Sequence, residues 1–404
     1  MQFDVKTIHS LEEQFGAPLY VFDEEAFVEN YRRFESIFQS AFSNYRISYS
    51  YKTNYTPYVC KLIHSLGGYA EVVSGMEYYI AKKIGYKDSE IIFNGPDKGQ
   101  DGVNAFLNGS MVNVDSIAEL KMLCNVACRN PKKNFECGVR VNLDIGQNFI
   151  SRFGMDKNDV TEAFNMVSTI DNLKISGLHC HISRCRGLEA WRKRTEYMLS
   201  LADEFFVETP DYLDLGSGMF GSMAPSFFSQ FSNVPSYEDY ASVTAKLVNE
   251  HYKNSSKQPI LFTEPGTTLI NKYIDFIGRI DAIKTVSGKT IAVLNCSEHN
   301  LGETCMLKQL PIEIIHSSEN VQYYEDVDFT GYTCLEQDVM YSGYNGKLAV
   351  GDYIVFGNTG GYSNVYKPPF IKPNCSMAAI RQDGTTALMK RAETYDDILH
   401  TYVF

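Results

Sequence analysis

The amino-acid sequence predicts an α/β protein: a (β/α)8 TIM-type barrel followed by a C-terminal antiparallel β-domain. Between residues 47 and 264, eight short apolar runs alternate with helical patterns. That rhythm, over roughly 220 residues, is typical of a (β/α)8 barrel. From about Tyr273 strand-like runs follow one another without long helices, which indicates an antiparallel β-domain.

The candidate barrel strands are short runs bounded by turn residues. They cover residues 47–52, 70–73, 91–94, 111–114, 137–143, 174–182, 212–216 and 259–264. Before the first of them, residues 24–40 have helical spacing, with an apolar stripe of Phe27, Tyr31, Phe34 and Ile37. The barrel is therefore expected to be preceded by a helix.

Helix boundary signals support this interpretation. Thr56 and Pro57 mark the start of a helix that stops at Gly67. Ser74 and Glu77 have the S-x-x-E spacing of a capping box. The helix that they open is expected to end near Gly85.

The β-domain is predicted from the strand-like runs after the barrel. These runs are 273–283, 289–296, 326–334, 347–357 and 386–393. The segment APLYVFD, residues 17–23, is a further strand candidate that we expect to join them. The predicted domains are therefore 24–268 for the barrel, and 1–23 with 269–404 for the β-domain.

The composition limits the classes of partner. A formal net charge of -12 argues against nucleic acid or an anionic membrane surface. It does not argue against a small anion, because a local site can oppose the overall field. We expect no signal peptide, and no run is long and apolar enough to span a bilayer. The ten cysteines are scattered, which favours a reducing cytoplasm over a disulfide framework.

Candidate functional residues fall where a (β/α)8 barrel places its site, at the C-terminal ends of the strands. They are Lys52 at the end of the first strand, Glu71 in the second, His181 at the end of the sixth, Gly216-Ser217-Gly218 following the seventh and Glu264-Pro265-Gly266 closing the eighth. The glycine run leaves backbone N–H groups unshielded, which suits a phosphate. A plain tight turn would have the same sequence.

Glu264 places a carboxylate at the end of an apolar strand, so it needs a partner or a raised pKa. One interpretation is that it holds a pyridine nitrogen protonated; the other is an ion pair with a barrel arginine such as Arg140. His179 and His181 share a strand face, but no third ligand of matching spacing accompanies them, and we expect no metal. A ring stacked on a flat cofactor, or a polar core histidine, fits His181 better.

Lys52 lies in the stretch ISYSYKTNY, whose alternation puts Ser48, Ser50 and Lys52 on one face. Alone, this pattern would indicate a half-exposed strand, but the eight-strand count places the face in the mouth of a barrel. A confined lysine loses its proton readily and forms a Schiff base with an aldehyde. A lysine, a phosphate loop, an acid for a ring nitrogen and a flat histidine are together what pyridoxal phosphate requires.

Ten ordered blocks carry a family resemblance over nearly the whole chain: YSYKTNY, AEVVSGMEY, FNGPDKG, VNVDS, SRFGM, GLHCHI, LDLGSGMFG, TEPG, GYTCLEQD and GNTGGYS. They resemble the pyridoxal-phosphate-dependent decarboxylases of the alanine-racemase-like fold. That group contains diaminopimelate, ornithine/arginine and carboxynorspermidine decarboxylases. The resemblance implies pyridoxal 5'-phosphate as cofactor and decarboxylation of a small amino acid at Cα.

The resemblance also implies roles for individual residues. Lys52 would form the Schiff base, His181 would stack on the ring, Glu264 would partner the ring nitrogen and Glu71 would lie near the Schiff base. Tyr362 and the Gly216–Gly218 loop would bind the phosphate, and Gly266 and Arg140 are counted with the cofactor-binding residues. Cys334 resembles a cysteine that the second subunit of a homodimer contributes to protonate Cα, and Asp338 matches the acid four positions beyond it.

The sequence departs from the family pattern where substrate is recognised. Thr267 replaces the usual arginine after Glu-Pro-Gly, and Leu335 replaces an acidic residue after the cysteine. Lys308 is the only cation near the position of another usual arginine, and Ser183-Arg184 replaces Gly-Ser. Arg184 or Arg186 could bind an anion, although a solvated surface role is more common. We therefore hypothesise a substrate other than diaminopimelate or ornithine, in a specialised pathway such as siderophore or antibiotic synthesis.

Two alternatives stay open at this point: an amino-acid racemase of the same fold, and a catalytically silent relative that acts as a regulator. Glu264 favours decarboxylation, since racemases of this fold tend to pair the ring nitrogen with arginine. Retention of both Lys52 and Cys334 argues against a silent protein.

Overall fold

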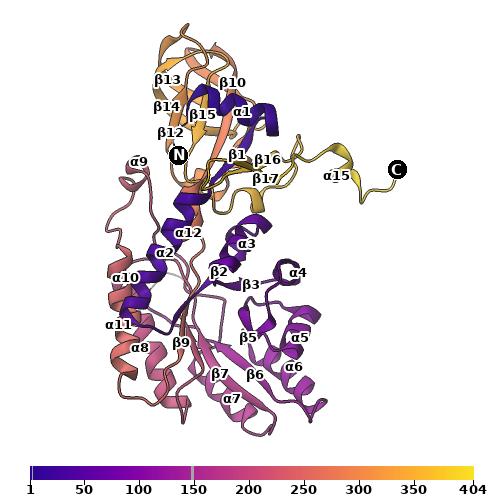
Figure 1. Cartoon of the computed structure of the whole chain (residues 1–404), viewed down its shortest axis with the longest axis vertical. Coiled ribbons are helices and arrows are strands. Elements are labelled where there is room, and N and C mark those ends of the chain that lie inside the picture. Colours follow the sequence, from indigo (N-terminus) through magenta and orange to yellow (C-terminus); the bar gives the residue numbers. More distant parts are fainter. Residues whose placement is uncertain (2, 147–149) are drawn as a thin grey trace. The chain divides into compact units, whose positions relative to one another are not determined.

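The computed structural model describes residues 1, 3–146 and 150–404 of the chain. These residues form two compact units (Figure 1). The barrel unit contains residues 31–220 and 233–268, and the β unit contains residues 1–30, 221–232 and 269–404. No helix of the described residues combines the length and apolar character that crossing a membrane requires.

The barrel unit confirms the predicted (β/α)8 architecture. Among the described residues, eight strands, each parallel to its neighbours, close into a barrel: β2 (Tyr45–Ser50), β3 (Tyr69–Val72), β4 (Ile91–Phe93), β5 (Met111–Val114), β6 (Phe135–Arg140), β7 (Leu173–His179), β8 (Tyr212–Asp214) and β9 (Ile260–Thr263). Closure pairs the first strand with the last, with Ile47 opposite Thr263. The residues that end β2 and those that follow β9 therefore meet at one rim.

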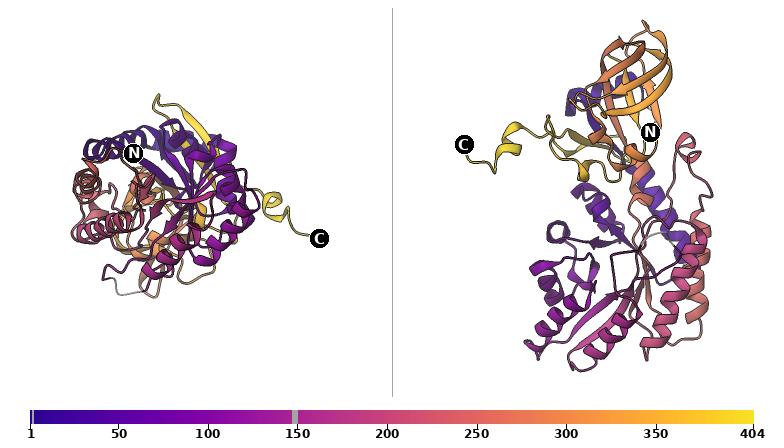
Figure 2. Two further views of the ribbon diagram at one scale, coloured as in Figure 1. Left: turned by 90° about the horizontal axis from the view of Figure 1, so that it is seen from below. Right: turned by 180° about the vertical axis from the view of Figure 1, so that it is seen from behind.

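Helices lie around the barrel strands, as the end-on view in Figure 2 shows. They are α2 (Glu24–Ala41), which spans the boundary of the two units, α3 (Pro57–Ser65), α4 (Gly75–Ile84), α5 (Gly99–Asn108), α6 (Ile117–Cys128), α7 (Lys157–Val167), α8 (Leu188–Phe205), α10 (Tyr237–Val243), α11 (Ala245–Tyr252) and the short α12 (Thr267–Ile270). Short 3-10 turns are η1 (Tyr51–Thr53), η2 (Asp88–Glu90), η3 (Asn271–Tyr273) and η4 (Asn364–Tyr366). The helix predicted before the barrel is α2, although Phe38 rather than Ile37 completes its buried stripe.

The start of α4 differs in one detail from the predicted capping box. The Ser74 hydroxyl accepts a hydrogen bond from Glu77 N (3.3 Å), as expected. The Glu77 carboxylate, however, accepts from Val73 N (2.7 Å), one residue before the position that a capping box uses. Glu77 is thereby turned back toward the end of β3 and is buried.

The β unit confirms the predicted β-domain; most of its described strand pairs are antiparallel, as expected, but the sheet is mixed because two pairs are parallel. The strand path is β14-β13-β11-β10-β1-β16-β17, with β15 paired to β10 and β12. The predicted N-terminal strand, β1 (Leu19–Asp23), is antiparallel to β10 but parallel to β16, and β11 is parallel to β13. Short hairpins require antiparallel pairing. The barrel residues separate β1 from both of its neighbouring strands in sequence, and such a long connection permits either direction, so β1 can be antiparallel to β10 and parallel to β16.

The strands of the β unit after β1 are β10 (Ile274–Val286), β11 (Lys289–Leu294), β12 (Ile312–Ile315), β13 (Gln322–Thr330), β14 (Val339–Leu348), β15 (Tyr353–Phe356), β16 (Ser376–Ile380) and β17 (Thr386–Lys390). Its helices are α1 (Val5–Phe15), α9 (Pro225–Phe228), α13 (Glu298–Leu301), α14 (Glu303–Leu307) and α15 (Tyr395–Leu399). Helix α1 was not predicted. It begins at Asp4, whose side chain caps Thr7 N, and packs Ile8 and Leu11 against the sheet.

Gly85 provides a test of the helix boundaries. It ends α4 with φ of +111°. We expect Gly85→Ala to lower the free energy of unfolding by about 1 kcal/mol, because an alanine Cβ is strained in left-handed backbone. Gly85→Asn is the matched control, since a Cβ at this position meets open space and asparagine adopts left-handed backbone more readily than alanine. Urea unfolding followed by circular dichroism measures both, and equal losses would contradict a backbone origin.

Candidate active site

Lys52 lies on η1, directly after β2, at the C-terminal rim of the barrel. Its Nζ is 2.6 Å from Glu71 Oε2 and 2.7 Å from Ser50 Oγ. The Ser50 hydroxyl also donates to Glu71 Oε2 (2.5 Å). The Glu71 carboxylate is buried, whereas the Lys52 side chain keeps 30% exposure. The polar face predicted for the first strand thus ends in an ammonium group that contacts Glu71 and Ser50, on a side chain that stays partly exposed.

Gly266 allows the residues after β9 to approach this lysine. A Cβ at Gly266 would lie 2.0 Å from Thr53 Oγ1 and 3.3 Å from Ser50 Cβ. Both of these residues flank Lys52 in the chain. A side chain at position 266 would therefore displace the turn that carries Lys52.

Glu264 follows β9 and is buried, with polar groups around its carboxylate. His179 Nε2 lies 3.2 Å from Glu264 Oε1, and His181 Nδ1 lies 3.7 Å from Oε2. The ion pair with Arg140 that the sequence left open is not formed among these described residues, because Arg140 Nη1 lies 3.2 Å from Asp115 Oδ1. His179, which ends β7, and His181, two residues beyond it, lie against Glu264 instead.

The charges of this cluster are divided between Glu264 and its neighbour Asp214. Burial acts to raise the pKa of Glu264, but His179, Lys52 and His181 outweigh it and hold that pKa well below its usual range. Burial and the Glu264 charge raise the pKa of Asp214 well above its usual range. Burial lowers the pKa of both histidines. The pKa of Glu264 is therefore lowered and that of its neighbour Asp214 raised, so the two carboxyl groups are shifted in opposite directions.

An amide joins the two carboxylates of the site. Asn94 Nδ2 donates to Glu264 Oε1 (2.5 Å) and to Glu71 Oε1 (3.2 Å). Its own oxygen accepts from Asn113 Nδ2 (2.8 Å), and Tyr212 OH donates to Asn113 Oδ1 (2.6 Å). We did not predict this series of hydrogen bonds from the sequence. An amide inside the apolar strand MVNV is the signal that could have revealed Asn113.

The Gly216–Gly218 loop connects β8 to the same cluster. Gly216 N donates to Asp214 Oδ1 (2.9 Å), and Ser217 N donates to His181 Nδ1 (3.1 Å). Gly218 has φ of +106°, and a Cβ there would meet only Ile182 O at 3.4 Å. Gly216 N and Ser217 N are thus engaged within the protein, contrary to the expectation of unshielded N–H groups, and the left-handed Gly218 is the position of this loop that suits a phosphate group.

Arg194 on α8 donates hydrogen bonds to this loop, and we did not predict its role from the sequence. Its buried guanidinium donates to the carbonyls of Leu215 (2.8 Å), Ser217 (3.2 Å) and Ile182 (3.3 Å). The carbonyl groups of the loop are thus directed at a fixed cation.

His179, Asp214 and Glu264 form a group that could offer metal ligands, with donor atoms within 4.8 Å of one another. The sequence had suggested only the histidine pair. Two features disfavour a metal here: Asn94 directs an N–H at Glu264, and the raised pKa of Asp214 opposes the loss of the proton that a carboxylate ligand must release. That no metal binds stays a prediction.

Three other predicted residues lie in the β unit. Cys334 is exposed on the loop between β13 and β14, and Leu335 beside it is half-buried. Asp338 is buried, and its carboxylate accepts from Glu298 N (2.8 Å) and Thr333 Oγ1 (2.6 Å). The contacts of Asp338 thus order the loop that carries Cys334.

The remaining predicted residues have varied surroundings. Tyr362, in the β unit, is half-buried with φ of +54°. Lys308 Nζ donates to Gln230 O (2.9 Å), which places it against the 221–232 segment of its own unit. In the barrel unit, Arg184 is exposed with φ of +66° after β7, and Thr267 is half-buried at the start of α12. Their roles toward substrate stay predictions.

Glu77 is a further buried acid near the rim. Burial raises its pKa to about 7, with Val73 N–H opposing the shift and the Glu71 charge adding to it. The family resemblance did not assign this residue, and its S-x-x-E position indicated only a helix cap.

The chain is similar to proteins of known activity over most of its length. Residues 26–271 match the family model described as "Pyridoxal-dependent decarboxylase, pyridoxal binding domain". A diaminopimelate decarboxylase of Aquifex aeolicus is 26% identical, covering 97% of this chain and 93% of that protein. One of Methanocaldococcus jannaschii is 25% identical over 96% and 92%. The crystal structure of the M. jannaschii enzyme with L-lysine has a TM-score of 0.83 at 24% identity, covering 98% of this chain and 94% of the other.

The raised pKa of Glu77 predicts a pH dependence of stability. The folded protein keeps this proton up to about pH 7, whereas the unfolded chain releases it near pH 4.5. The free energy of unfolding therefore falls as pH rises through this interval and then levels off.

We expect Glu77→Gln, which keeps an oxygen for Val73 N–H, to remove up to about 3 kcal/mol of the fall between pH 5 and pH 8. Urea unfolding at both pH values measures it, with exposed Glu196→Gln as control. An unchanged pH dependence in Glu77→Gln would contradict a titration of this group.

Proposed function

The chain belongs to the pyridoxal-dependent decarboxylase family, and from that premise we propose which residues bind the cofactor and what kind of substrate the site accepts. The protein is a carboxy-lyase that uses pyridoxal phosphate to decarboxylate a small amino acid. The observation that carries the assignment of residues is the Lys52 ammonium at the rim, beside Glu71 and joined through Asn94 to the ionised Glu264.

Bound pyridoxal phosphate supplies an electron sink for the bond between Cα and the departing carboxylate. Lys52 Nζ is the nitrogen that would hold it, because it is amine-bearing, rim-placed and partly open. Glu264 would hold a proton on the ring nitrogen, which the low pKa of its carboxylate supports. His181 would lie against the ring, and the Gly216–Gly218 loop would receive the phosphate.

The substrate we propose differs from those of the ordinary diaminopimelate and ornithine enzymes. Relatives named diaminopimelate decarboxylase are only 26% and 25% identical to this chain. The residues that replace the usual substrate-binding groups, Thr267 and Leu335, carry no charge. A substrate whose distal end is uncharged matches such a site better than a substrate whose distal end carries a second amino and carboxylate group.

We also propose a homodimer with shared sites, in which Cys334 delivers a proton to Cα in the partner's site. Cys334 is exposed and its loop is ordered by the buried Asp338, as a residue that works outside its own subunit requires. A cytoplasmic location is part of the proposal and agrees with ten cysteines that are all free in the described structure.

Carbon dioxide release from a panel of amino acids tests the function and the substrate together. We expect release from at least one amino acid with an uncharged distal end, and a yellow protein that borohydride bleaches. Lys52→Ala should lose the colour and at least 1000-fold of the rate, roughly the size expected for loss of a covalent group. Exposed Lys61→Ala on α3 is the control. Turnover with meso-diaminopimelate alone would contradict the substrate proposal, and an inverted enantiomer without carbon dioxide would contradict decarboxylation.

Mixing variants tests the shared site. Lys52→Ala and Cys334→Ala should each be nearly inactive. After subunit exchange, half of the dimers are mixed and each has one intact site, so activity should return to about a quarter of the unmodified enzyme. Lys52→Ala mixed with the Lys52→Ala/Cys334→Ala double variant should show no recovery. Proven exchange without recovery in the first mixture would overturn the shared site.

A further inference from the structure

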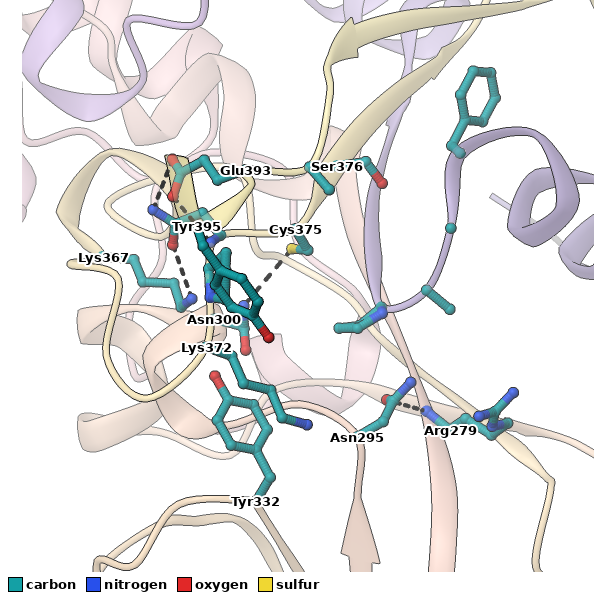
Figure 3. Close-up of a pocket in the computed structure, with 17 residues that line it drawn as sticks. Arg279, Asn295, Asn300, Tyr332, Lys367, Lys372, Cys375, Ser376, Glu393 and Tyr395 are labelled. Carbon is teal, nitrogen blue, oxygen red and sulfur yellow. Dashed lines mark hydrogen bonds between the residues drawn. The ribbon is translucent and has the colours of Figure 1, made fainter. Parts of the chain in front are cut away.

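The β unit contains a cavity of about 440 Å³ that the proposed function does not use. It is lined by the Phe15–Pro18 connection between α1 and β1, by the chain before β16 and by the first residue of α15 (Figure 3). All of its lining residues belong to the β unit. Its volume lies in the range of small-molecule sites.

Two lysines line this cavity without a carboxylate partner. Lys367 is 9% exposed, and its Nζ donates to the amide oxygen of Asn374 (2.8 Å). Lys372 Nζ lies 4.0 Å from the centre of the Tyr332 ring. Within the described part of the chain, neither lysine forms an ion pair. Burial of an ammonium group without an anion is unfavourable, so the Lys367 position needs a compensating charge.

The one other buried lysine of the described residues shows the usual arrangement. Lys98 Nζ lies 2.7 Å from Glu119 Oε2, so its charge is neutralised within the protein. Lys367 has an amide oxygen where Lys98 has a carboxylate. The difference leaves the cavity with an excess of positive charge in a chain of net charge -12.

The carboxylate in the cavity wall is already engaged. Glu393 accepts from Asn374 N (3.0 Å) and Asn374 Nδ2 (3.1 Å), and Lys390 Nζ lies 3.2 Å from it. These contacts occupy the Asn374 N–H groups, and the Asn374 oxygen accepts from Lys367 Nζ. Glu393 thus orients the amide; its charge acts on Lys367 from a distance, but the described residues include no ion pair between the two.

We propose that this cavity is a binding site for a small organic or inorganic oxyanion, whose carboxylate or phosphate group lies between Lys367 and Lys372. Tyr332 and Tyr395 would flank the ligand, since both rings line the cavity. The Asn300 side chain, which donates to Cys375 Sγ (3.8 Å), adds a polar group to the wall. Burial lowers the pKa of Lys367, and a bound anion would raise it again.

Lysine acylation followed by peptide mass spectrometry tests the site in the holoenzyme. Malonate and inorganic phosphate are the two probes, and sodium chloride at equal ionic strength is the control. We expect malonate, phosphate or both to slow acylation of Lys367 and Lys372 by about tenfold, with exposed Lys347 on β14 unaffected. Protection by one probe alone identifies a carboxylate or a phosphate ligand.

Equilibrium dialysis of labelled probe against variants then measures the affinity. Lys367→Met and Lys372→Met should each weaken binding about tenfold, whereas Lys347→Met should not. Because Lys372 is exposed, its variant tests the site even where Lys367→Met is poorly folded. The readout does not depend on turnover, so failure of the proposed substrate would leave it interpretable. Absence of protection by both probes, or equal affinity in Lys372→Met and Lys347→Met, would overturn the proposal.

Discussion

The buried carboxylate of Glu264 is the group on which the rest of the site depends. An ionised carboxylate inside a barrel is stable only when polar groups surround it; here Asn94 Nδ2 donates to Glu264, and the rings of His179 and His181 lie 3.2 Å and 3.7 Å from its oxygens. Barrel closure makes this possible, because pairing of β9 with β2 brings the end of the last strand beside the turn that carries Lys52. The absence of a side chain at Gly266 lets the two segments touch. Proton distribution, lysine position and loop geometry all follow from these contacts.

The neighbouring acid, Asp214, shows how one fold can shift the pKa values of two buried carboxyl groups in opposite directions. Both are buried, but Glu264 has cationic and N–H partners while Asp214 faces the Glu264 charge. The pKa of Asp214 is therefore raised, and its Oδ1 accepts a hydrogen bond from Gly216 N. Because that amide belongs to the glycine loop, the electrostatics of Glu264 and the conformation of the loop are linked through a single residue.

Much of the barrel was predictable because its signals are local. Strand runs such as IIFN, the Pro57 start and the Gly85 stop each reflect a conformational preference of a few residues. The β unit was predicted less well. The parallel pairing of β1 with β16 joins residues more than 350 positions apart. Strand β14 contains glycine and polar residues, so its sequence lacks the usual pattern of a strand. In the site, Lys52, Glu71, His181 and Glu264 were identifiable because each ends or lies in a strand, whereas Asn94 and Arg194 act through partners distant in sequence.

The sequence by itself determined the class of fold, the order of the barrel strands and the chemical groups at the rim, because these depend on short-range pattern and residue type. Only the tertiary structure decided which groups meet. It placed Arg140 on Asp115 and the histidines on Glu264, and it left Lys367 facing an amide while Lys98 faces a carboxylate. Pairing of charges depends on distances of a few ångströms between residues far apart in the chain, and no pattern of neighbouring residues contains that information.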